Sequence, residues 1–392
     1  MIYNFDTVPD RRGTESIKWH YYGEDVLPLW VADMDFVSPE PVIRALRERV
    51  EHGIFGYPQC TVTDIKATAE MRQTILRWLG ERYDWELKPQ DLIFLPGVAT
   101  GFNLACHTQF IPQGEVLVQT PLYPPILSAP EHAGLVRRDA ELKRCPDGTY
   151  SVDQGTFDAG LNEKTRLFIL CNPHNPVGRV FQRDELEFMA EACLRRGVVI
   201  CSDEIHCDLV YKGRQHIPIA ALDAEIAQNT ITLMAPSKTF NIAGLQCSFA
   251  VIQNSELRRR YQRAGKGLVH WVNLMGWTAM QAAYKEGQDW LDQLLVYLEG
   301  NRDYVYTRVN QELPGISMAR PEGTYLAWLD CRQAGIEGNP FNFFLEKGRV
   351  ALNDGATFGQ GGEGFVRLNF GCPRSLLAEG LERMKRALKS RG

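Results

Sequence analysis

The stretch Thr-Ile-Thr-Leu-Met-Ala-Pro-Ser-Lys-Thr-Phe-Asn, residues 230–241, decides the fold class of this 392-residue chain. Its first five residues are apolar or β-branched, a composition typical of a strand that is buried on both faces. The chain then breaks at Pro236 and Ser237, so Lys238 is expected just beyond the carboxyl end of that strand. A lysine in such a place can form a Schiff base with an aldehyde.

Two upstream segments end in the same way. The sequences CNPHNPVG (171–178) and CSDEIH (201–206) each follow an apolar run and supply Asn175 and Asp203. Asp203 lies 28 residues after Asn175, and Lys238 lies 35 residues after Asp203, which in each case is about the length of one βα unit. Because parallel strands end at the same edge of a sheet, these three side chains are expected to meet there.

An amide, a carboxylate and an amine at one sheet edge are what pyridoxal phosphate needs. The amide can donate a hydrogen bond to the ring phenolate oxygen, the carboxylate can pair with the ring nitrogen, and the lysine can hold the aldehyde. Taken alone, a Ser-Lys pair after a strand is more often a surface feature, and an Asp-Glu pair more often lies in a solvated turn. Their order and separation favour a cofactor site.

Strand-like and helical segments alternate from about residue 91 onward. Apolar runs predict strands at 91–95, 116–119, 167–170, 198–201, 230–234 and 248–252. Between two of them, residues 183–196 place five apolar side chains on one helical face: Leu186, Met189, Ala190, Cys193 and Leu194. This alternation predicts an α/β fold with a mainly parallel sheet covered on both faces, and ligands beyond the carboxyl ends of its strands.

The length of the chain exceeds that of one ordinary domain. We expect an N-terminal arm with part of a small domain at 1–45, a large cofactor-binding domain at 46–288 and a small α+β domain at 289–392. A helix is predicted around 42–52. Further helices and short strands are expected near the C-terminus, at 289–313, 326–329, 365–370 and 376–389.

Composition and charge exclude several classes of protein. The net charge of −5 argues against a nucleic-acid surface, and no apolar run is long enough to span a membrane. The first residues lack the pattern of a signal peptide, so a cytoplasmic location is expected. The ten cysteines form no CxxC pair, and the adjacent His206 and Cys207 lack further ligands, so no metal site is predicted.

The ordered motifs of the chain resemble those of fold-type I pyridoxal-phosphate enzymes, and among them the carbon–sulfur β-lyases of the MalY/PatB cystathionine β-lyase type. The resemblance covers nearly the whole length and rests on LPLWVADMDF (27–36), HGIFGYP (52–58), FLPGVATG (94–101), TPLYPPI (120–126), NPHNPVGRV (172–180), SDEIHCDLV (202–210), APSKTFNIAGL (235–245) and VRLNFGCPR (366–374). It implies an aspartate aminotransferase-like fold and β-elimination of L-cystathionine or related cysteine S-conjugates to a thiol, pyruvate and ammonia.

The resemblance also implies roles for residues around the cofactor ring. Lys238 should hold the cofactor and then move the α proton of the substrate, and Asp203 should keep the ring nitrogen protonated. Asn175 should donate to the phenolate oxygen, and Tyr123 should stack on the ring. His206 stands where aminotransferases usually have a tyrosine, whereas the lyase branch resembles this chain in having a histidine there. Two roles remain open for His206: contact with the cofactor, or a buried core residue with satisfied hydrogen bonds.

The cofactor phosphate is expected at the start of the helix that follows the first strand. The backbone amides of Gly97, Val98 and Ala99 and the hydroxyl of Ser237 should bind it. This sequence departs from many relatives in having Ala235 in place of a serine and Gln246 near the position of an arginine, so that amides and hydroxyls must meet most of the phosphate charge.

Substrate and partner contacts are implied by three further residues. Arg367 resembles the arginine that binds the substrate α-carboxylate through two donors, and the backbone amide of Ala32 is the expected second contact. Tyr57 resembles a tyrosine that reaches the phosphate site of the neighbouring subunit, which implies a homodimer with shared active sites. An aminotransferase and a lyase-like protein with an added regulatory binding role remain alternatives, and the thiol leaving group stays open.

Overall fold

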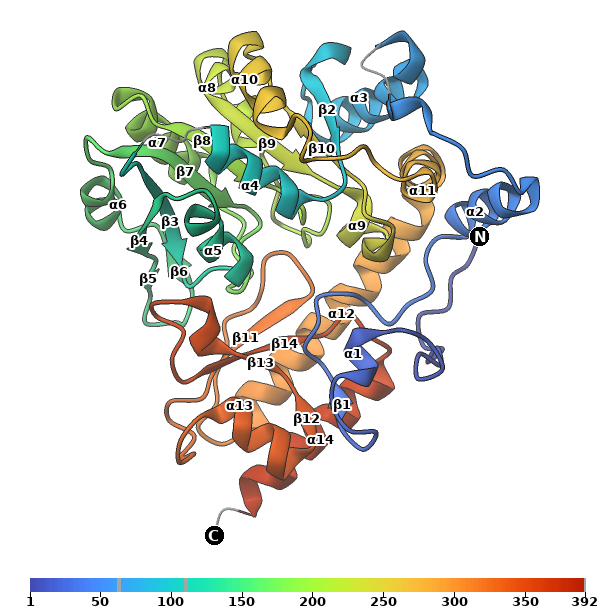
Figure 1. The fold of residues 1–392 in the computed structure, drawn as a ribbon. Helices are drawn as coiled ribbons and strands as arrows, with labels where there is room; N and C mark the ends of the chain where they lie inside the picture. The colour runs from blue at the N-terminus through green and yellow to red at the C-terminus, as the bar shows by residue number, and fades with distance from the viewer. Residues whose placement is uncertain (62–64, 109–111, 391–392) are drawn as a thin grey trace.

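A seven-stranded sheet forms the centre of the larger part of the computed structural model, which describes residues 1–61, 65–108 and 112–390 (Figure 1). The strand order is β2-β10-β9-β8-β7-β3-β4. All neighbouring strands are parallel except that β10 runs antiparallel to both β2 and β9. The strands span Leu92–Leu95 (β2), Glu115–Thr120 (β3), Val136–Glu141 (β4), Thr165–Cys171 (β7), Val199–Asp203 (β8), Thr230–Met234 (β9) and Ser248–Val251 (β10).

All six strands predicted from apolar runs are present, and the predicted mainly parallel sheet is confirmed. The prediction missed β4, which lies at the sheet edge beside β3. This strand has the sequence VRRDAE, and its first three residues are exposed to solvent. Its sequence lacks the apolar run on which the other strands were recognised, because an edge strand is not buried on both faces.

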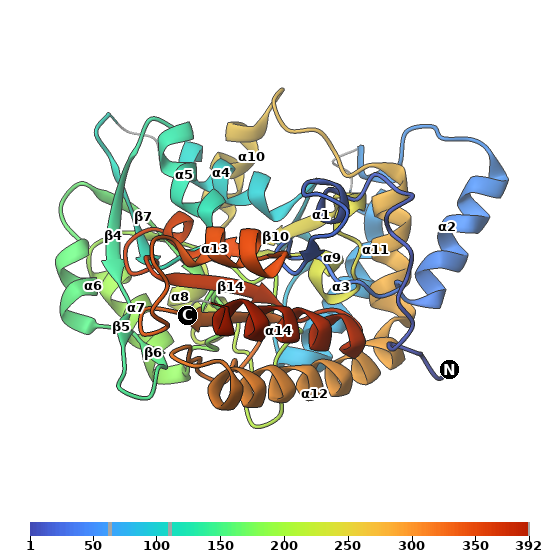
Figure 2. The same ribbon diagram turned by 90° about the horizontal axis from the view of Figure 1, so that it is seen from below.

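Helices cover both faces of the sheet. On β3, Val116 and Val118 pack towards the face covered by α4, α5 and α10, whereas Leu117 packs towards α6 and α7. Figure 2 shows these two sets of helices on opposite sides of the strands. The helices span Val98–Thr108 (α4), Pro124–His132 (α5), Gln154–Gly160 (α6), Arg183–Arg195 (α7), Ala224–Gln228 (α8), Ser255–Gly265 (α10), Ala69–Tyr83 (α3) and Leu274–Glu286 (α11).

A smaller α+β part follows the long helix α12, Gln288–Glu312. Its antiparallel sheet has the order β11-β14-β13, with β11 at Leu326–Asp330, β14 at Phe365–Asn369 and β13 at Asn353–Asp354. The helices α13, Pro340–Phe343, and α14, Arg374–Lys389, belong to this part, which lies below the large sheet in Figure 1. These elements agree with the expected α+β character, and the exact domain boundaries stay a prediction.

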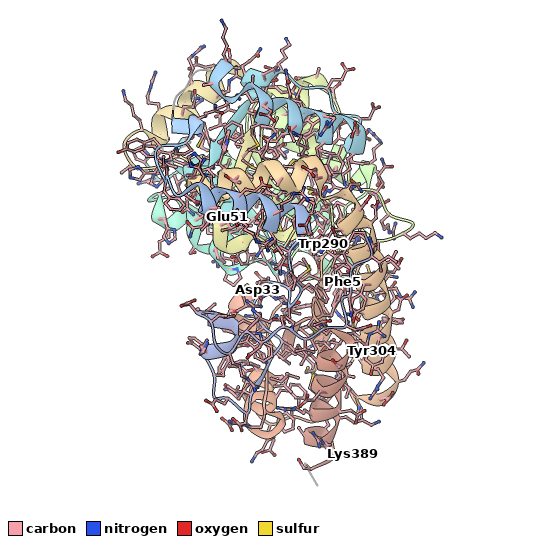
Figure 3. All side chains as sticks on the ribbon, turned by 90° about the vertical axis from the view of Figure 1, so that its right-hand side faces the viewer. Phe5, Asp33, Glu51, Trp290, Tyr304 and Lys389 are labelled. Carbon is pink, nitrogen blue, oxygen red and sulfur yellow. The ribbon has the colours of Figure 1, made fainter. Side chains whose placement is uncertain are left out.

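The N-terminal arm packs against this smaller part before the chain enters α2, Glu40–His52. Strand β1, Leu27–Pro28, pairs in parallel with β12, Val350–Ala351. The ring of Phe5 packs against Trp290 of α12 at a centroid distance of 5.8 Å, and Figure 3 shows the two side chains together. The arm also contains the short helix α1, Ile17–His20. Among the described residues, no helix has the length and apolar character needed to cross a bilayer.

Candidate active site

A cavity of about 820 Å³, counting its open mouth, lies at the carboxyl ends of β8 and β9. Ten of the twelve residues that the sequence assigned to the site line it: Ala32, Gly97, Val98, Ala99, Tyr123, Asn175, Asp203, His206, Ser237 and Lys238. The cavity also contacts residues that the sequence did not assign, namely Pro96, Phe102, Cys171, Ile205, Ala243, Gln246 and Cys247. Strand ends that are far apart in sequence therefore converge on one space, as the spacing of the motifs predicted.

Lys238 reaches this cavity from the one-turn helix α9, Pro236–Thr239, which begins two residues after β9 ends. Its Nζ donates a hydrogen bond of 2.7 Å to the carbonyl oxygen of Ala32. Burial, with a smaller contribution from the Arg367 charge, lowers the pKa of Lys238 to about 8, although Asp33 and Asp203 act in the opposite direction. About a tenth of this amine is therefore unprotonated at pH 7, far more than at the usual pKa of a lysine, and the unprotonated form is the one that acts as a nucleophile.

Asp203 ends β8 and is buried at the cavity. One carboxylate oxygen accepts a hydrogen bond of 3.1 Å from the backbone N–H of Ile205. Burial raises the pKa of Asp203 to about 7, against the opposing effect of Lys238. Within the described ranges, no side chain forms an ion pair with this carboxylate. A buried carboxylate without an ion-pair partner suits a cationic ligand group, such as a protonated ring nitrogen.

His206 is fully buried three residues after Asp203, and it lines the same cavity. Its Nδ1 has no hydrogen-bond partner among the described residues. Burial lowers the pKa of His206 well below its usual value, so the imidazole is neutral. The ring packs edge-on against Tyr325, with 5.7 Å between centroids. A neutral imidazole with an unsatisfied nitrogen at a cavity is suited to a polar ligand atom.

The expected binding site for the cofactor phosphate lies where β2 leads into α4. Gly97 immediately precedes the helix, and Val98 and Ala99 are its first residues, so their backbone N–H groups belong to the turn that lacks intrahelical acceptors. No heavy atom lies within 4 Å of the position that a Cβ on Gly97 would occupy. Ser237 lines the cavity as well, and among the described residues Lys238 is the only lysine or arginine that does so.

Tyr123 and Tyr57 occupy different environments. Tyr123 lines the cavity at the start of α5, and burial together with the Asp203 carboxylate raises its pKa. Tyr57 lies outside the cavity and is 85% exposed. Its ring packs against Trp271, with 5.6 Å between centroids. The proposed contact of Tyr57 with a neighbouring subunit therefore stays a prediction.

Arg367 lies on β14 and is buried beside the cavity. Its Nη1 donates a hydrogen bond of 3.0 Å to Asn175 Oδ1, which joins two residues predicted for different duties. Its Nη2 donates to Asn353 Oδ1 at 2.6 Å and to the Trp30 carbonyl at 3.1 Å. Its Nε has no partner among the described residues, and burial lowers the pKa of Arg367 to about 10. These three hydrogen bonds use three of the five N–H groups of the guanidinium, so the side chain is held in place while its Nε–H and one Nη1–H are left for a ligand.

Two residues that contact this side of the site were not predicted from the sequence. The hydroxyl of Tyr325 donates a hydrogen bond of 2.8 Å to the Ala32 carbonyl, the same oxygen that accepts from Lys238. Asn353 accepts from Arg367. Both residues lie in the smaller part of the molecule, and no motif spacing connects them with Lys238. Only the chain fold brings them near the cavity.

The side chains and backbone groups at the cavity fit pyridoxal phosphate. The buried carboxylate of Asp203, which lacks an ion-pair partner, suits the ring nitrogen, and the unsatisfied His206 nitrogen suits a ring oxygen. The open space over Gly97 at a helix N-terminus suits the phosphate. Lys238 provides a buried amine for the aldehyde.

Comparisons with known proteins agree with this chemistry. Residues 24–384 match the family described as aminotransferase class I and II. Cystathionine β-lyase PatB of Bacillus subtilis (strain 168) is 41% identical over 397 residues, which cover 98% of this chain and 100% of PatB. Protein MalY of Escherichia coli (strain K12) is 34% identical over 400 residues, which cover 99% of this chain and 100% of MalY.

A solved structure supports the same conclusion. The PLP-bound C–S lyase from Staphylococcus hominis superposes with a TM-score of 0.92 at 32% identity, covering 99% of this chain and 100% of that one. The aspartate aminotransferase-like fold and the pyridoxal phosphate cofactor expected from the sequence are confirmed by these matches. The chain therefore belongs to the aminotransferase class I and II family of pyridoxal-phosphate enzymes, in the carbon–sulfur lyase group that includes PatB and MalY.

Proposed function

We propose that this protein is a β-lyase that splits L-cystathionine or related cysteine S-conjugates into a thiol, pyruvate and ammonia. The observation that carries the proposal is the buried amine of Lys238 in one cavity with the buried carboxylate of Asp203, with Arg367 held beside them. The similarity to a cystathionine β-lyase over almost the full length supports this substrate class.

Bound pyridoxal phosphate supplies an electron sink that makes the α proton of an attached amino acid acidic. Lys238 accepts that proton from the α carbon, because its lowered pKa lets it act as a base near neutral pH. The bond between the β carbon and sulfur then breaks, and its electron pair leaves with the thiolate. Water then hydrolyses the remaining three-carbon unsaturated amine, which yields pyruvate and ammonia.

Residues of the cavity hold the cofactor in our proposal. Asp203 keeps the ring nitrogen protonated, since its buried carboxylate gains a cationic partner. Asn175 and His206 face the phenolate oxygen, and Tyr123 stacks on the ring. The backbone amides that open α4, at Gly97, Val98 and Ala99, bind the phosphate together with the Ser237 hydroxyl.

Substrate binding falls to Arg367 and Ala32 in this proposal. The guanidinium of Arg367 is fixed by Asn175 and Asn353, which leaves its free Nε–H to take part in binding the α-carboxylate. The backbone N–H of Ala32 is the second donor. The carboxylate is common to all amino-acid substrates, so these contacts orient the α carbon towards Lys238 without selecting the thiol.

The proposed homodimer would account for the exposure of Tyr57. The exposed ring of this tyrosine packs against that of Trp271, which is also exposed, so the two form an aromatic surface beyond the cavity. In the proposed dimer, Tyr57 of one subunit reaches the phosphate site of the other. Sedimentation of the purified protein tests the dimer, and mixing Tyr57→Ala with Lys238→Ala subunits tests site sharing, because each mixed dimer then has one site with both defects and one intact site.

The reaction is tested with purified protein and added pyridoxal phosphate. Cystathionine, cystine and alanine are incubated separately, and the products are identified by mass. The lyase predicts pyruvate and a thiol from cystathionine without any added keto acid. An aminotransferase, which the family description also allows, would need a keto acid and would convert alanine. The cytoplasmic location and an added regulatory role stay predictions.

A further inference from the structure

The backbone of residues 30–36, which we name the strap, connects the catalytic lysine with both parts of the molecule. The Ala32 carbonyl in the strap accepts hydrogen bonds from Lys238 Nζ at 2.7 Å and from the Tyr325 hydroxyl at 2.8 Å. The Trp30 carbonyl accepts from Arg367 at 3.1 Å. A shift of the strap would therefore disturb contacts to the base and to the proposed carboxylate site together.

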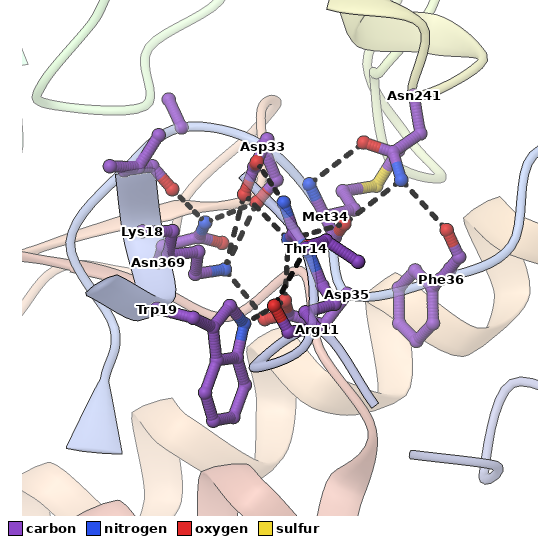
Figure 4. Close-up of polar contacts among 12 residues, drawn as sticks. Arg11, Thr14, Lys18, Trp19, Asp33, Met34, Asp35, Phe36, Asn241 and Asn369 are labelled. Carbon is purple, nitrogen blue, oxygen red and sulfur yellow. Dashed lines mark hydrogen bonds and ion pairs between the residues drawn. The ribbon is translucent and has the colours of Figure 1, made fainter. Parts of the chain in front are cut away.

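Asn241 holds the strap from the side of the large sheet. Its Oδ1 accepts the Met34 N–H at 2.9 Å, and its Nδ2 donates to the carbonyls of Met34 at 2.9 Å and Phe36 at 2.8 Å. Figure 4 shows this side chain facing both residues. Asn241 lies three residues after Lys238 and has a φ of 55°, a left-handed conformation that asparagine tolerates better than most residues.

The smaller part and the arm hold the strap from the opposite side. Asn369 Nδ2 donates to the carbonyls of Val31 at 2.5 Å and Asp33 at 2.6 Å. A partly buried ionic cluster also holds the strap, as Figure 4 shows: Lys18 Nζ lies 2.6 Å from Asp35 Oδ2, and Arg11 pairs with both Asp33, at 2.7 Å, and Asp35, at 2.6 Å. Two cations face two anions, so this side of the strap is fixed without a net buried charge.

We propose that Asn241 is a positioning residue that keeps the strap in register with the turn that carries Lys238. One short piece of chain bears both the base and the amide that holds the strap, so these three hydrogen bonds couple the position of the strap, which includes Ala32, to the position of the base. The inference rests on the proposed function for its kinetic consequence, since Ala32 is there a carboxylate contact. Its structural part is independent of the reaction.

The test uses Asn241→Gly, because glycine adopts the left-handed φ without strain and removes only the side-chain bonds. The matched control is Asn254→Gly. Asn254 also makes three hydrogen bonds to backbone, two to the start of α10 and one to Gln228, far from the strap in sequence. In cofactor-free protein, hydrogen exchange of the Met34 amide should become roughly tenfold faster in Asn241→Gly and stay unchanged in the control.

With cofactor bound, Asn241→Gly should raise KM by roughly three- to tenfold for every amino-acid substrate, while kcat and the visible absorbance of the resting enzyme change little. Asn241→Asp should raise KM at least as much, because a carboxylate still accepts from the Met34 N–H but places a negative charge against two carbonyl oxygens that need a donor. An Asp variant with wild-type KM would overturn the proposal, as would unchanged exchange of the Met34 amide in the Gly variant.

Failure of the proposed function gives a different result. If the wild type releases no pyruvate from any cysteine conjugate, the lyase assignment fails. Faster exchange at Met34 in Asn241→Gly would still support the positioning role, since that measurement requires no turnover. Equal acceleration of Met34 exchange in Asn254→Gly would indicate general loosening and would also overturn the role of Asn241.

Discussion

The two walls of the active-site cavity are built in different ways. The cofactor wall consists of strand ends: Asp203 closes β8, and Lys238 follows β9, its neighbour in the sheet. In the register of the sheet, Cys171 at the end of β7 stands beside Asp203, which stands beside Leu233. The other side, which we call the substrate wall after its proposed role, is formed by the strap and by residues of the smaller part beside the cavity. Arg367 donates one hydrogen bond to the Trp30 carbonyl, and Tyr325 donates one to the Ala32 carbonyl.

Mutations in the two walls should therefore have different effects. Backbone ladders fix the cofactor wall, so changing one of its functional side chains removes chemistry while leaving the position of the others intact. The substrate wall depends on contacts between residues about 300 positions apart, such as Tyr325 with Ala32. Changes there should weaken binding in graded steps, of about the size of the hydrogen bonds that are lost.

Lys238→Ala should have the largest effect. The variant loses the proposed base and the amine that holds the cofactor, so pyruvate release from cystathionine should fall on the order of 10⁴-fold or more. Its fold should persist, as measured by circular dichroism and thermal unfolding. The same change at the exposed Lys266 serves as the control and should leave the rate unaltered. Substantial activity in Lys238→Ala would remove the lysine from the mechanism.

Asp203→Asn should come next, with turnover reduced on the order of 10³-fold although the cofactor still binds. A neutral amide cannot stabilise a protonated ring nitrogen, so the electron sink weakens. Steady-state rates at saturating pyridoxal phosphate, together with the cofactor content of the protein, check this. Turnover equal to that of the wild type would place the ring nitrogen elsewhere.

The same substitution should have the opposite effect on the stability of the cofactor-free protein. Burial raises the pKa of Asp203 from 3.8 to about 7, so the folded state binds this proton more tightly than the unfolded state between those values. As pH rises from 4 to 8, the wild type should therefore lose stability relative to Asp203→Asn, by up to about 4 kcal/mol. Urea unfolding at both pH values measures the change, and a pH-independent difference would contradict it.

Arg367→Lys tests the substrate wall and should have a moderate effect. An ammonium cannot reproduce the fixed guanidinium, so productive binding of every amino-acid substrate should weaken by about 2 to 3 kcal/mol. The visible absorbance of the resting enzyme should change little. Arg374→Lys is the control, because Arg374 donates to Asn301 on α12. A loss confined to cystathionine would assign Arg367 to the thiol side.

Tyr325→Phe should have the smallest effect. It removes one donor to the Ala32 carbonyl, which retains its bond from Lys238, so kcat/KM should fall by about 1 kcal/mol, or roughly fivefold. Rates with cystathionine and with a second cysteine conjugate should fall by the same factor. A loss above a hundredfold would show that the hydroxyl takes part in the chemistry, and the division between the two walls would then fail.

The sheet and the residues Asn175, Asp203 and Lys238 of the cofactor wall could be predicted from the sequence. Apolar runs identified six of the seven strands, and the spacing of Asn175, Asp203 and Lys238 brought them to one edge, because parallel βα units repeat at a nearly constant length. The edge strand β4 was not predicted, because its exposed polar residues lack the apolar run by which the other strands were recognised. For the substrate wall, Arg367 and Ala32 were expected only through family resemblance. The contact of Tyr57 with a neighbouring subunit stays a prediction.

The assembly of the substrate wall could not be predicted and is seen only in the folded chain. The hydrogen bonds of Arg367 to Asn175, of Tyr325 to Ala32 and of Asn241 to Met34 join segments of the chain that share no repeat and no local pattern. Local sequence periodicity reports burial within one helix or strand, whereas such contacts depend on how whole elements pack. The two walls therefore differ in the range of the contacts that position them. The positions of the strand ends follow from the regular hydrogen-bond ladder of the sheet, whereas the position of the strap depends on contacts with segments that are distant in sequence.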